Sequence, residues 1–269
     1  MIVKSAFLAV SLCTVSLAAV RSGKATAEWI TASKTCDGGL PVSTAIRLVV
    51  DAGYHTYWMN PGEAGIKISV KWELPNGWKA GEPAHPVPKR FETGGIAGFG
   101  YEGTVILPAS VTPPTDFSGT ATLKGKLSWL TCNDEGCIPG EVEITLTLDA
   151  GAPAPTPEAK VIDAALRKIP ITPGSRISLK VVENPKSLLL RIDGLIGKSV
   201  NLAEYEVFPA TPQVIDPGAK IRFQSDGDSW VAEAPKSESA AKAIQEVTLV
   251  LAGQSDQAPI SLTWKSAAK

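Results

Sequence analysis

The chain has 269 residues, of which 44% are apolar and 20% charged, and its formal net charge is −1 at pH 7. This composition is typical of a foldable globular protein and excludes a disordered or fibrous one. A nucleic-acid-binding protein needs a clustered positive surface. Because 26 basic side chains are balanced by 27 acidic ones, we expect no nucleic-acid partner.

The N-terminal segment has the layout of a secretory signal peptide. Its apolar run, from Ser5 to Val20, follows Lys4 and is shorter than the ~20 residues that a membrane-spanning helix requires. The small residues of Ala25-Thr26-Ala27 then have the pattern of a cleavage site. We therefore expect a signal peptide over residues 1–27 and an exported, soluble mature protein.

Alternation of apolar and polar residues predicts β-strands throughout the first half of the chain. The pattern is clearest over residues 66–74, 120–130 and 142–148, where each strand is expected to have one buried and one wet face. Shorter strands are predicted at residues 45–50 and 103–107, with turn residues between them. Short strands separated by frequent turns indicate an antiparallel β-sandwich.

A stretch rich in proline and alanine divides the chain. From Ala150 to Pro157 it carries three prolines and no charge, which predicts a linker. Thr156 is a suitable N-cap, and apolar residues at helical spacing continue until Pro170, so a short helix is expected to open a second domain. Strand patterns then resume at residues 177–182, 188–192, 220–223, 247–251 and 260–264. The expected units are a signal peptide over 1–27, a β-sandwich over 28–149, a linker over 150–160 and a second β-sandwich over 161–269.

Three cysteines follow the expected signal peptide: Cys36, Cys132 and Cys137. The last two lie in the connection between two predicted neighbouring strands, and a hairpin loop makes a disulfide between them geometrically reasonable. A ring this short stabilises by roughly 2 kcal/mol, whereas a Cys36–Cys132 bond would approach ~4.7 kcal/mol. The short disulfide is therefore better suited to exchange than to bracing, with a plain structural disulfide as the alternative. We expect Cys36 to be a free thiol in a turn.

Other groups of reactive residues are weaker candidates for a functional site. His55 and His85, together with the cysteines, offer copper or zinc ligands, but they lack a compact ligand spacing. Glu63 and Glu102 have no serine or histidine constellation around them, which disfavours hydrolytic chemistry. We therefore expect neither a metal nor a cofactor.

Three segments carry a resemblance to a known family: Trp129 to Glu141 with the two cysteines, His55 to Gly65, and Phe99 to Gly103. In this combination and order they resemble the N-terminal periplasmic domain of the thiol:disulfide interchange protein DsbD and of ScsB-type proteins. The second domain resembles the additional one in ScsB-like chains. The resemblance implies an all-β fold class, with two immunoglobulin-like antiparallel β-sandwich domains and one short linker helix.

The resemblance also implies a function and partners. It implies a periplasmic thiol:disulfide oxidoreductase in which Cys137 forms mixed disulfides and Cys132 resolves them. Because the sequence contains no membrane-spanning or thioredoxin-like domain, we expect a membrane-embedded thiol-disulfide electron donor of the DsbD, ScsB or CcdA kind. The expected acceptors are periplasmic disulfide or thioredoxin-like proteins, in cytochrome c biogenesis, copper tolerance or disulfide correction.

A mobile cap loop shields the cysteine pair in the family. The matching stretch is residues 91–98, where glycines give the backbone freedom and Phe91 or Ile96 is the expected apolar lid. The candidate site comprises Cys132 and Cys137, the cap residues Phe91, Glu92, Gly94, Gly95 and Ile96, and the nearby Tyr101 and Pro139. Two alternatives remain open: a non-catalytic β-sandwich binding module with a structural disulfide, and a copper-handling protein.

Overall fold

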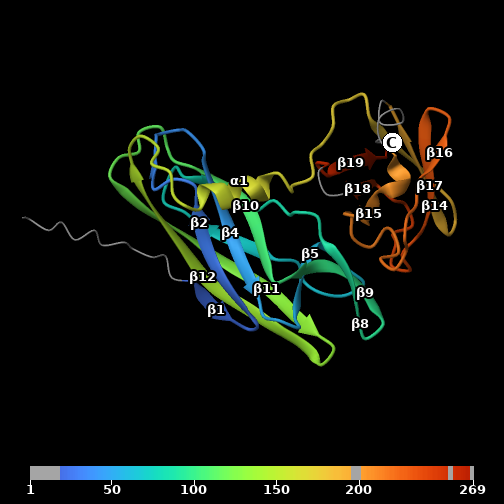
Figure 1. Ribbon diagram of the computed structural model, residues 1–269, viewed down its shortest axis with the longest axis horizontal. Helices are drawn as coiled ribbons and strands as arrows, with labels where there is room; N and C mark the ends of the chain where they lie inside the picture. The colour runs from blue at the N-terminus through green and yellow to red at the C-terminus, as the bar shows by residue number, and fades with distance from the viewer. Residues whose placement is uncertain (1–18, 195–200, 254–256, 267–269) are drawn as a thin grey trace, which may run out of the picture.

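The computed structural model describes residues 19–194, 201–253 and 257–266, and they form two β domains (Figure 1). The described residues contain one α-helix, which lies between the domains in sequence. None of their helices has the length and apolar character needed to cross a membrane. The predicted all-β fold class, with two sandwich domains and one short helix, is confirmed.

The first domain is a sandwich of two sheets. One sheet has the strand order β1-β2-β4-β10-β7. Its strands are β1 (Val20–Ser22), β2 (Ala25–Thr31), β4 (Val42–Val50), β10 (Thr104–Thr112) and β7 (Lys79–Ala80). The other has the order β3-β12-β11-β5-β9-β8, with β6 also paired to β11. Its strands are β3 (Thr35–Cys36), β12 (Gly136–Ala150), β11 (Thr120–Asn133), β5 (His55–Gly62), β9 (Ile96–Glu102), β8 (Lys89–Thr93) and β6 (Ser69–Glu73).

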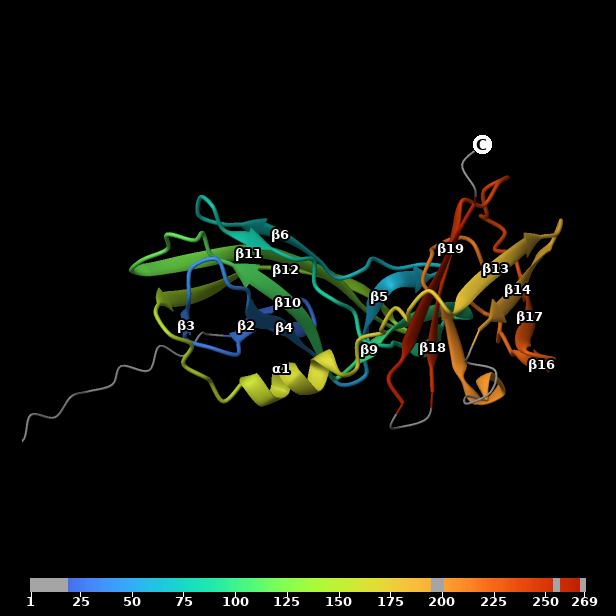
Figure 2. The same ribbon diagram turned by 90° about the horizontal axis from the view of Figure 1, so that it is seen from above.

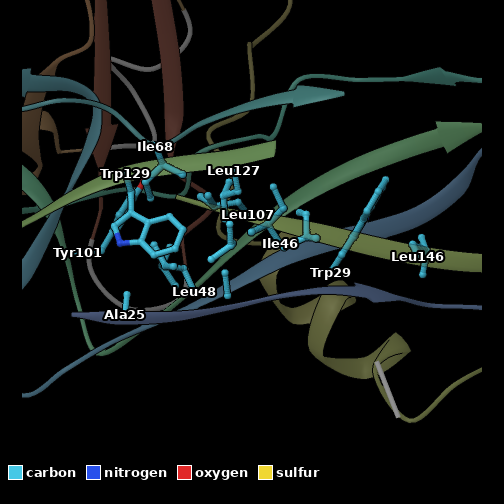
Figure 3. Packing of buried hydrophobic residues seen from close by; sticks show 14 of the residues in the cluster. Ala25, Trp29, Ile46, Leu48, Ile68, Tyr101, Leu107, Leu127, Trp129 and Leu146 are labelled. Carbon is cyan, nitrogen blue, oxygen red and sulfur yellow. The ribbon is translucent and has the colours of Figure 1, made fainter. Parts of the chain in front are cut away.

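The core between these sheets follows from the period of two that the sequence shows. Along β11, Leu123, Leu127 and Trp129 are buried in the core. Leu127 and Trp129 lie in one cluster with residues of the opposite sheet such as Leu107 (Figure 3). Fully burying one such aliphatic side chain contributes about 1.5–3 kcal/mol. The intervening lysines face outward, and Lys124 forms an ion pair with Glu143 across β12. The two faces of β11 are therefore chemically distinct.

The cysteines lie in a longer hairpin than the sequence predicts. Strands β11 and β12 are paired from Thr120↔Asp149 to Asn133↔Gly136, so only two residues separate the last pair. Both cysteines are thus strand residues rather than loop residues, which corrects the expectation of a cysteine-bearing loop. The turn can be this tight because the side-chain oxygen of Asn133 accepts hydrogen bonds from the backbone N–H groups of Glu135 and Gly136.

The end of the expected signal peptide lies within the first sheet. Most of the segment 1–27 falls outside the described residues, but residues 20–22 form β1 and Ala25 begins β2. Ala27 is completely buried in the core. So is Ala25 (Figure 3). Cleavage after Ala27 would therefore remove β1 and three residues of β2 from the sandwich.

Cleavage of the expected signal peptide is accordingly predicted after Ala18, ahead of β1, because the small residues Ser16 and Ala18 also satisfy the pattern of a cleavage site. Intact-mass measurement of the protein recovered from the envelope of an expressing bacterium checks this. A mature N-terminus at Glu28 in a folded protein would contradict it, because β2 would then lack its buried alanines.

The short helix belongs to the first domain and does not open the second. Helix α1 (Ala159–Leu166) packs Ile162 against Ile30 and Ala45. Its N-cap is Glu158, without a side-chain cap, and the predicted cap Thr156 instead donates its hydroxyl to the Thr31 carbonyl. Part of the expected linker is likewise bound to the first domain, since the Lys34 N–H donates to the Ala154 carbonyl at 2.9 Å. The Thr156 side chain thus binds the first sheet and does not cap the helix.

The second domain also consists of two sheets. One has the order β13-β14-β17-β16 and the other β15-β18-β19. The elements are β13 (Ser178–Glu183), β14 (Ser187–Asp193), a 3-10 helix η1 (Leu202–Glu204), β15 (Glu206–Pro209), β16 (Gln224–Asp226), β17 (Ser229–Pro235), β18 (Glu246–Ala252) and β19 (Ile260–Lys265). The predicted strand at 220–223 precedes β16 without joining a ladder, although Ile221 and Phe223 are buried in the core.

The second domain packs against the end of the first domain that carries β5 and β9 (Figure 2). Phe208 of β15 meets Trp58 and Phe99 edge-on, with ring centroids 6.2 and 6.0 Å away. The Asn60 side-chain amide donates to the Pro209 carbonyl at 2.7 Å. The guanidinium of Arg90, on β8, donates to the Val207 carbonyl at 2.6 Å and lies over the rings of Phe99 and Phe208. The two domains therefore share one apolar contact region.

Candidate redox site

Cys132 and Cys137 form a disulfide, as the sequence predicts. They are directly opposed residues of β11 and β12, and their Cα atoms are 4.1 Å apart. The two ends of the bond differ in environment, because Cys132 is fully buried whereas Cys137 is exposed. One sulfur is thus presented to solvent and the other is covered.

The burial of Cys132 does not come from the sandwich core. In β11 the core face is formed by residues in phase with Leu127 and Trp129, and Cys132 is in phase with the outward-facing Lys124 and Lys126. An outward-facing side chain of this sheet is normally wet, as both lysines are. Cys132 must therefore be covered by neighbouring strands of the same sheet.

An aromatic cluster on this outward face provides the cover. His55 of β5 is the register partner of Cys132, so both side chains project from the same face. Tyr57, two residues further along β5, shares that face, and its hydroxyl is 3.4 Å from His55 Nε2. The ring of Phe91, from β8, stacks on the His55 ring at 3.8 Å between centroids and meets Tyr57 at 5.7 Å. We call His55, Tyr57 and Phe91 the aromatic cover.

Glycines make room for the aromatic cover. Phe91 reaches His55 across β9, where a Cβ on Gly98 would lie 2.4 Å from the Phe91 ring. A Cβ on Gly100 would lie 1.8 Å from the Thr56 carbonyl oxygen and 3.0 Å from the Phe91 ring. Gly65, with φ of 116°, lies directly against the Tyr57 ring. The close packing of the aromatic cover therefore depends on residues without a side chain at Gly65, Gly98 and Gly100.

The expected cap loop is a regular β-hairpin. Strands β8 and β9 pair from Lys89↔Gly100 to Thr93↔Ile96, and Gly94 and Gly95 form the two-residue turn with φ of 58° and 82°. Of the two proposed lids, Phe91 lies in the aromatic cover, while Ile96 is 44% exposed. Glu92 is exposed as well. The covering element is thus a strand of the sheet, and its apolar contribution is Phe91.

The other two candidate site residues, Tyr101 and Pro139, lie on different faces of the sheet. Tyr101 is paired with Thr56 and points away from the aromatic cover, where its hydroxyl donates to the Pro86 carbonyl at 2.9 Å. Pro139 is exposed and lies two residues beyond Cys137 on the same face. Only Pro139 is therefore beside the disulfide.

Burial governs the ionisation of the aromatic cover. It lowers the pKa of His55 below its usual value, against the opposing effect of the carboxylates of Glu102 and Asp134. It raises the pKa of Tyr57. At neutral pH the site therefore contains a neutral imidazole beside a protonated phenol. His55 was considered in the sequence as a metal ligand, but its register position identifies it as a neighbour of Cys132, a relation that spacing alone does not reveal.

The other histidine and the third cysteine lie elsewhere. His85 is partly buried on the opposite side of the sheet near the Tyr101 hydroxyl, and desolvation lowers its pKa to about 4. Cys36 is a buried free thiol beside Ala150, at the far end of β12, and burial is the largest cause of its raised pKa. At about 3.3 Å per residue, the strand separates it from Cys137 by roughly 40 Å. No group of three or more metal-binding side chains occurs within 19–194, 201–253 and 257–266.

Comparisons with known proteins place this geometry in a family. Residues 32–149 match the family model "Thiol:disulfide interchange protein DsbD, N-terminal". The N-terminal periplasmic domain of ScsB from Proteus mirabilis has a similar structure, with a TM-score of 0.66 and 20% identity over 91% of this chain and 94% of that one. The sporulation control protein Spo0M from Bacillus subtilis aligns over 91% of each chain with a TM-score of 0.24 and 8% identity, which is too low to indicate a shared fold. No curated protein matches the sequence. By this match over residues 32–149, which include the dicysteine hairpin, the first domain belongs to the DsbD N-terminal domain family.

Proposed function

We propose that the protein transfers reducing equivalents in the bacterial periplasm by cycling Cys132 and Cys137 between dithiol and disulfide. The observation that carries this proposal is the asymmetry of the pair, with an exposed Cys137 and a Cys132 buried under the aromatic cover. A disulfide that serves only to brace a hairpin has no need of such a cover. Membership of the first domain in the DsbD N-terminal family supports the same chemistry.

The asymmetry supports different roles for the two sulfurs. Thiol–disulfide exchange proceeds through a mixed disulfide, which requires that a partner sulfur approach the protein sulfur. Cys137 is accessible to a partner, so it forms the mixed disulfide. Cys132 is reached only from within the protein, so it resolves the mixed disulfide by attacking Cys137.

The donor and the acceptors are other proteins of the envelope. The donor in this proposal is a membrane-embedded protein with a thiol pair of the DsbD, ScsB or CcdA kind. The acceptors are periplasmic disulfide or thioredoxin-like proteins, in cytochrome c maturation, copper tolerance or disulfide correction. The periplasmic location of the similar ScsB domain supports this compartment.

The reduction potential of the Cys132–Cys137 bond is expected to lie above about −300 mV, because exposed disulfides are more readily reduced than buried structural ones. Equilibration with dithiothreitol or glutathione buffers, followed by alkylation and mass spectrometry, measures it. A Cys36→Ser background leaves the exchanging pair as the only thiols of the mature chain. A potential well below −300 mV would instead support a structural disulfide in a binding module.

A further inference from the structure

We propose that His55 is the proton acceptor for the Cys132 thiol when Cys132 resolves the mixed disulfide. The inference rests on the proposed exchange function and deepens it. It begins from the environment of Cys132, whose exposed fraction is 0%. A thiol must become a thiolate to act as a nucleophile, and burial disfavours the thiolate. Because Cys132 is buried, a protein group must take its proton.

His55 is the residue placed to do so. It is directly opposite Cys132 across β5 and β11, and such pairs have Cβ atoms about 4.5–5.5 Å apart on one face. His55 is itself only 6% exposed, so the two side chains share one covered compartment. The Phe91 ring on one side and the Tyr57 hydroxyl at Nε2 fix the orientation of the imidazole.

The charged surroundings of His55 suit a neutral base. From β9 the opposed residue is Glu102, which also forms an ion pair with Lys89 of β8 at 3.2 Å. From the β11–β12 turn the carboxylate of Asp134 acts on His55. Both carboxylates favour a protonated imidazole, but burial has the larger effect, and the pKa of His55 is lowered. The imidazole is consequently unprotonated at pH 7 and free to accept a proton.

The resolving step can be written with all atoms and electrons in balance. The Cys132 Sγ–H gives its proton to a ring nitrogen of His55, and the Cys132 sulfur attacks Sγ of Cys137. The bond between Cys137 and the partner sulfur breaks, and the partner leaves as a thiolate with the electron pair. Over the full cycle the two protein thiols are oxidised to one disulfide and the partner disulfide is reduced. In the reverse direction the protonated imidazole returns the proton to Cys132.

The test uses a small disulfide rather than a protein partner, namely 5,5′-dithiobis(2-nitrobenzoic acid), in the Cys36→Ser background. The first thionitrobenzoate released reports the attack by Cys137, and the second reports resolution by Cys132. In the parent we expect the second rate to rise through the pKa of His55 and to level off near pH 7. In His55→Gln it should be slower by about 10²-fold at pH 7, and should keep rising with pH as the thiolate fraction grows.

His85→Gln is the matched control, because it removes the other histidine, which lies partly buried on the opposite side of the sheet, and its profile should follow the parent. A His55→Gln profile parallel to the parent would overturn the proposal, since a uniform offset reports altered access rather than lost proton transfer. Nuclear magnetic resonance titration of His55 in the unmutated chain gives a second check: its pKa must coincide with the kinetic inflection, and a mismatch overturns the assignment. Failure to capture envelope partners would count against the exchange function and leave this result unaffected.

Discussion

Replacing Cys132 by Ala should cause mixed disulfides with envelope proteins to accumulate through Cys137, several-fold above the level for Cys137→Ala. The exposed sulfur still reacts in the first variant, but the intermolecular bond has no internal thiol to collapse it. In the second variant the remaining sulfur is buried, so few partners reach it. Acid quenching, non-reducing affinity purification and mass spectrometry of the released partners measure the difference.

The double variant Cys132→Ala, Cys137→Ala is the control for non-specific capture, and Cys36→Ser is included throughout. A membrane protein with a thiol pair should be among the trapped species, because the proposed exchange requires an electron donor. If neither single variant captures a partner, the binding-module alternative gains support. If only Cys137→Ala captures partners, exchange survives and the roles of the two sulfurs are reversed.

Replacing Phe91 by Ala should speed reduction of the disulfide by dithiothreitol up to about tenfold. Phe91 contributes two ring contacts to the aromatic cover, and an aromatic pair is worth about 0.5–1.5 kcal/mol. Losing them uncovers His55 and, beneath the cover, Cys132. Stopped-flow reduction followed by tryptophan fluorescence measures the rate.

Ile96→Ala is the matched control, since Ile96 belongs to the same hairpin but is 44% exposed, and its rate should equal that of the parent. Circular dichroism confirms that each variant remains folded. Equal rates for folded Phe91→Ala and the parent would show that Phe91 does not limit access to the disulfide. Acceleration in both variants would point to loosening of the whole hairpin instead.

Much of the first domain could be predicted from its period of two. The alternation that places Leu123, Leu127 and Trp129 inside also places Cys132 on the outward face, in phase with Lys124. What the alternation cannot predict is that Cys132 is buried there. Its cover comes from β5 and β8, which are distant in sequence and are brought beside β11 only by the order of strands in the sheet. For the same reason, the alternation could not predict that His55 lies opposite Cys132.

Two other differences have local causes. Thr156 and Pro157 have the pattern of a helix start, but the Thr156 hydroxyl bonds the Thr31 carbonyl, and the helix begins later, where Ile162 packs on the first sheet. Gly94 and Gly95 are as compatible with a flexible loop as with a tight hairpin turn. The pairing of Phe91 with Gly98 is what makes this segment a hairpin and not a flexible loop. The short local sequence pattern does not reveal that pairing.

Adjacent residues of a strand point to opposite faces. In β8, Arg90 and Phe91 therefore contact different parts of the protein. Arg90 donates to carbonyls of Val207 and Pro217 in the second domain, while Phe91 covers the redox site. A chain cut after α1 would expose the apolar surface of Phe99 and leave the Arg90 guanidinium without its carbonyl acceptors. The domain that carries Cys132 and Cys137 is therefore expected to depend on the second domain, which binds the same strand that contributes Phe91 to the aromatic cover.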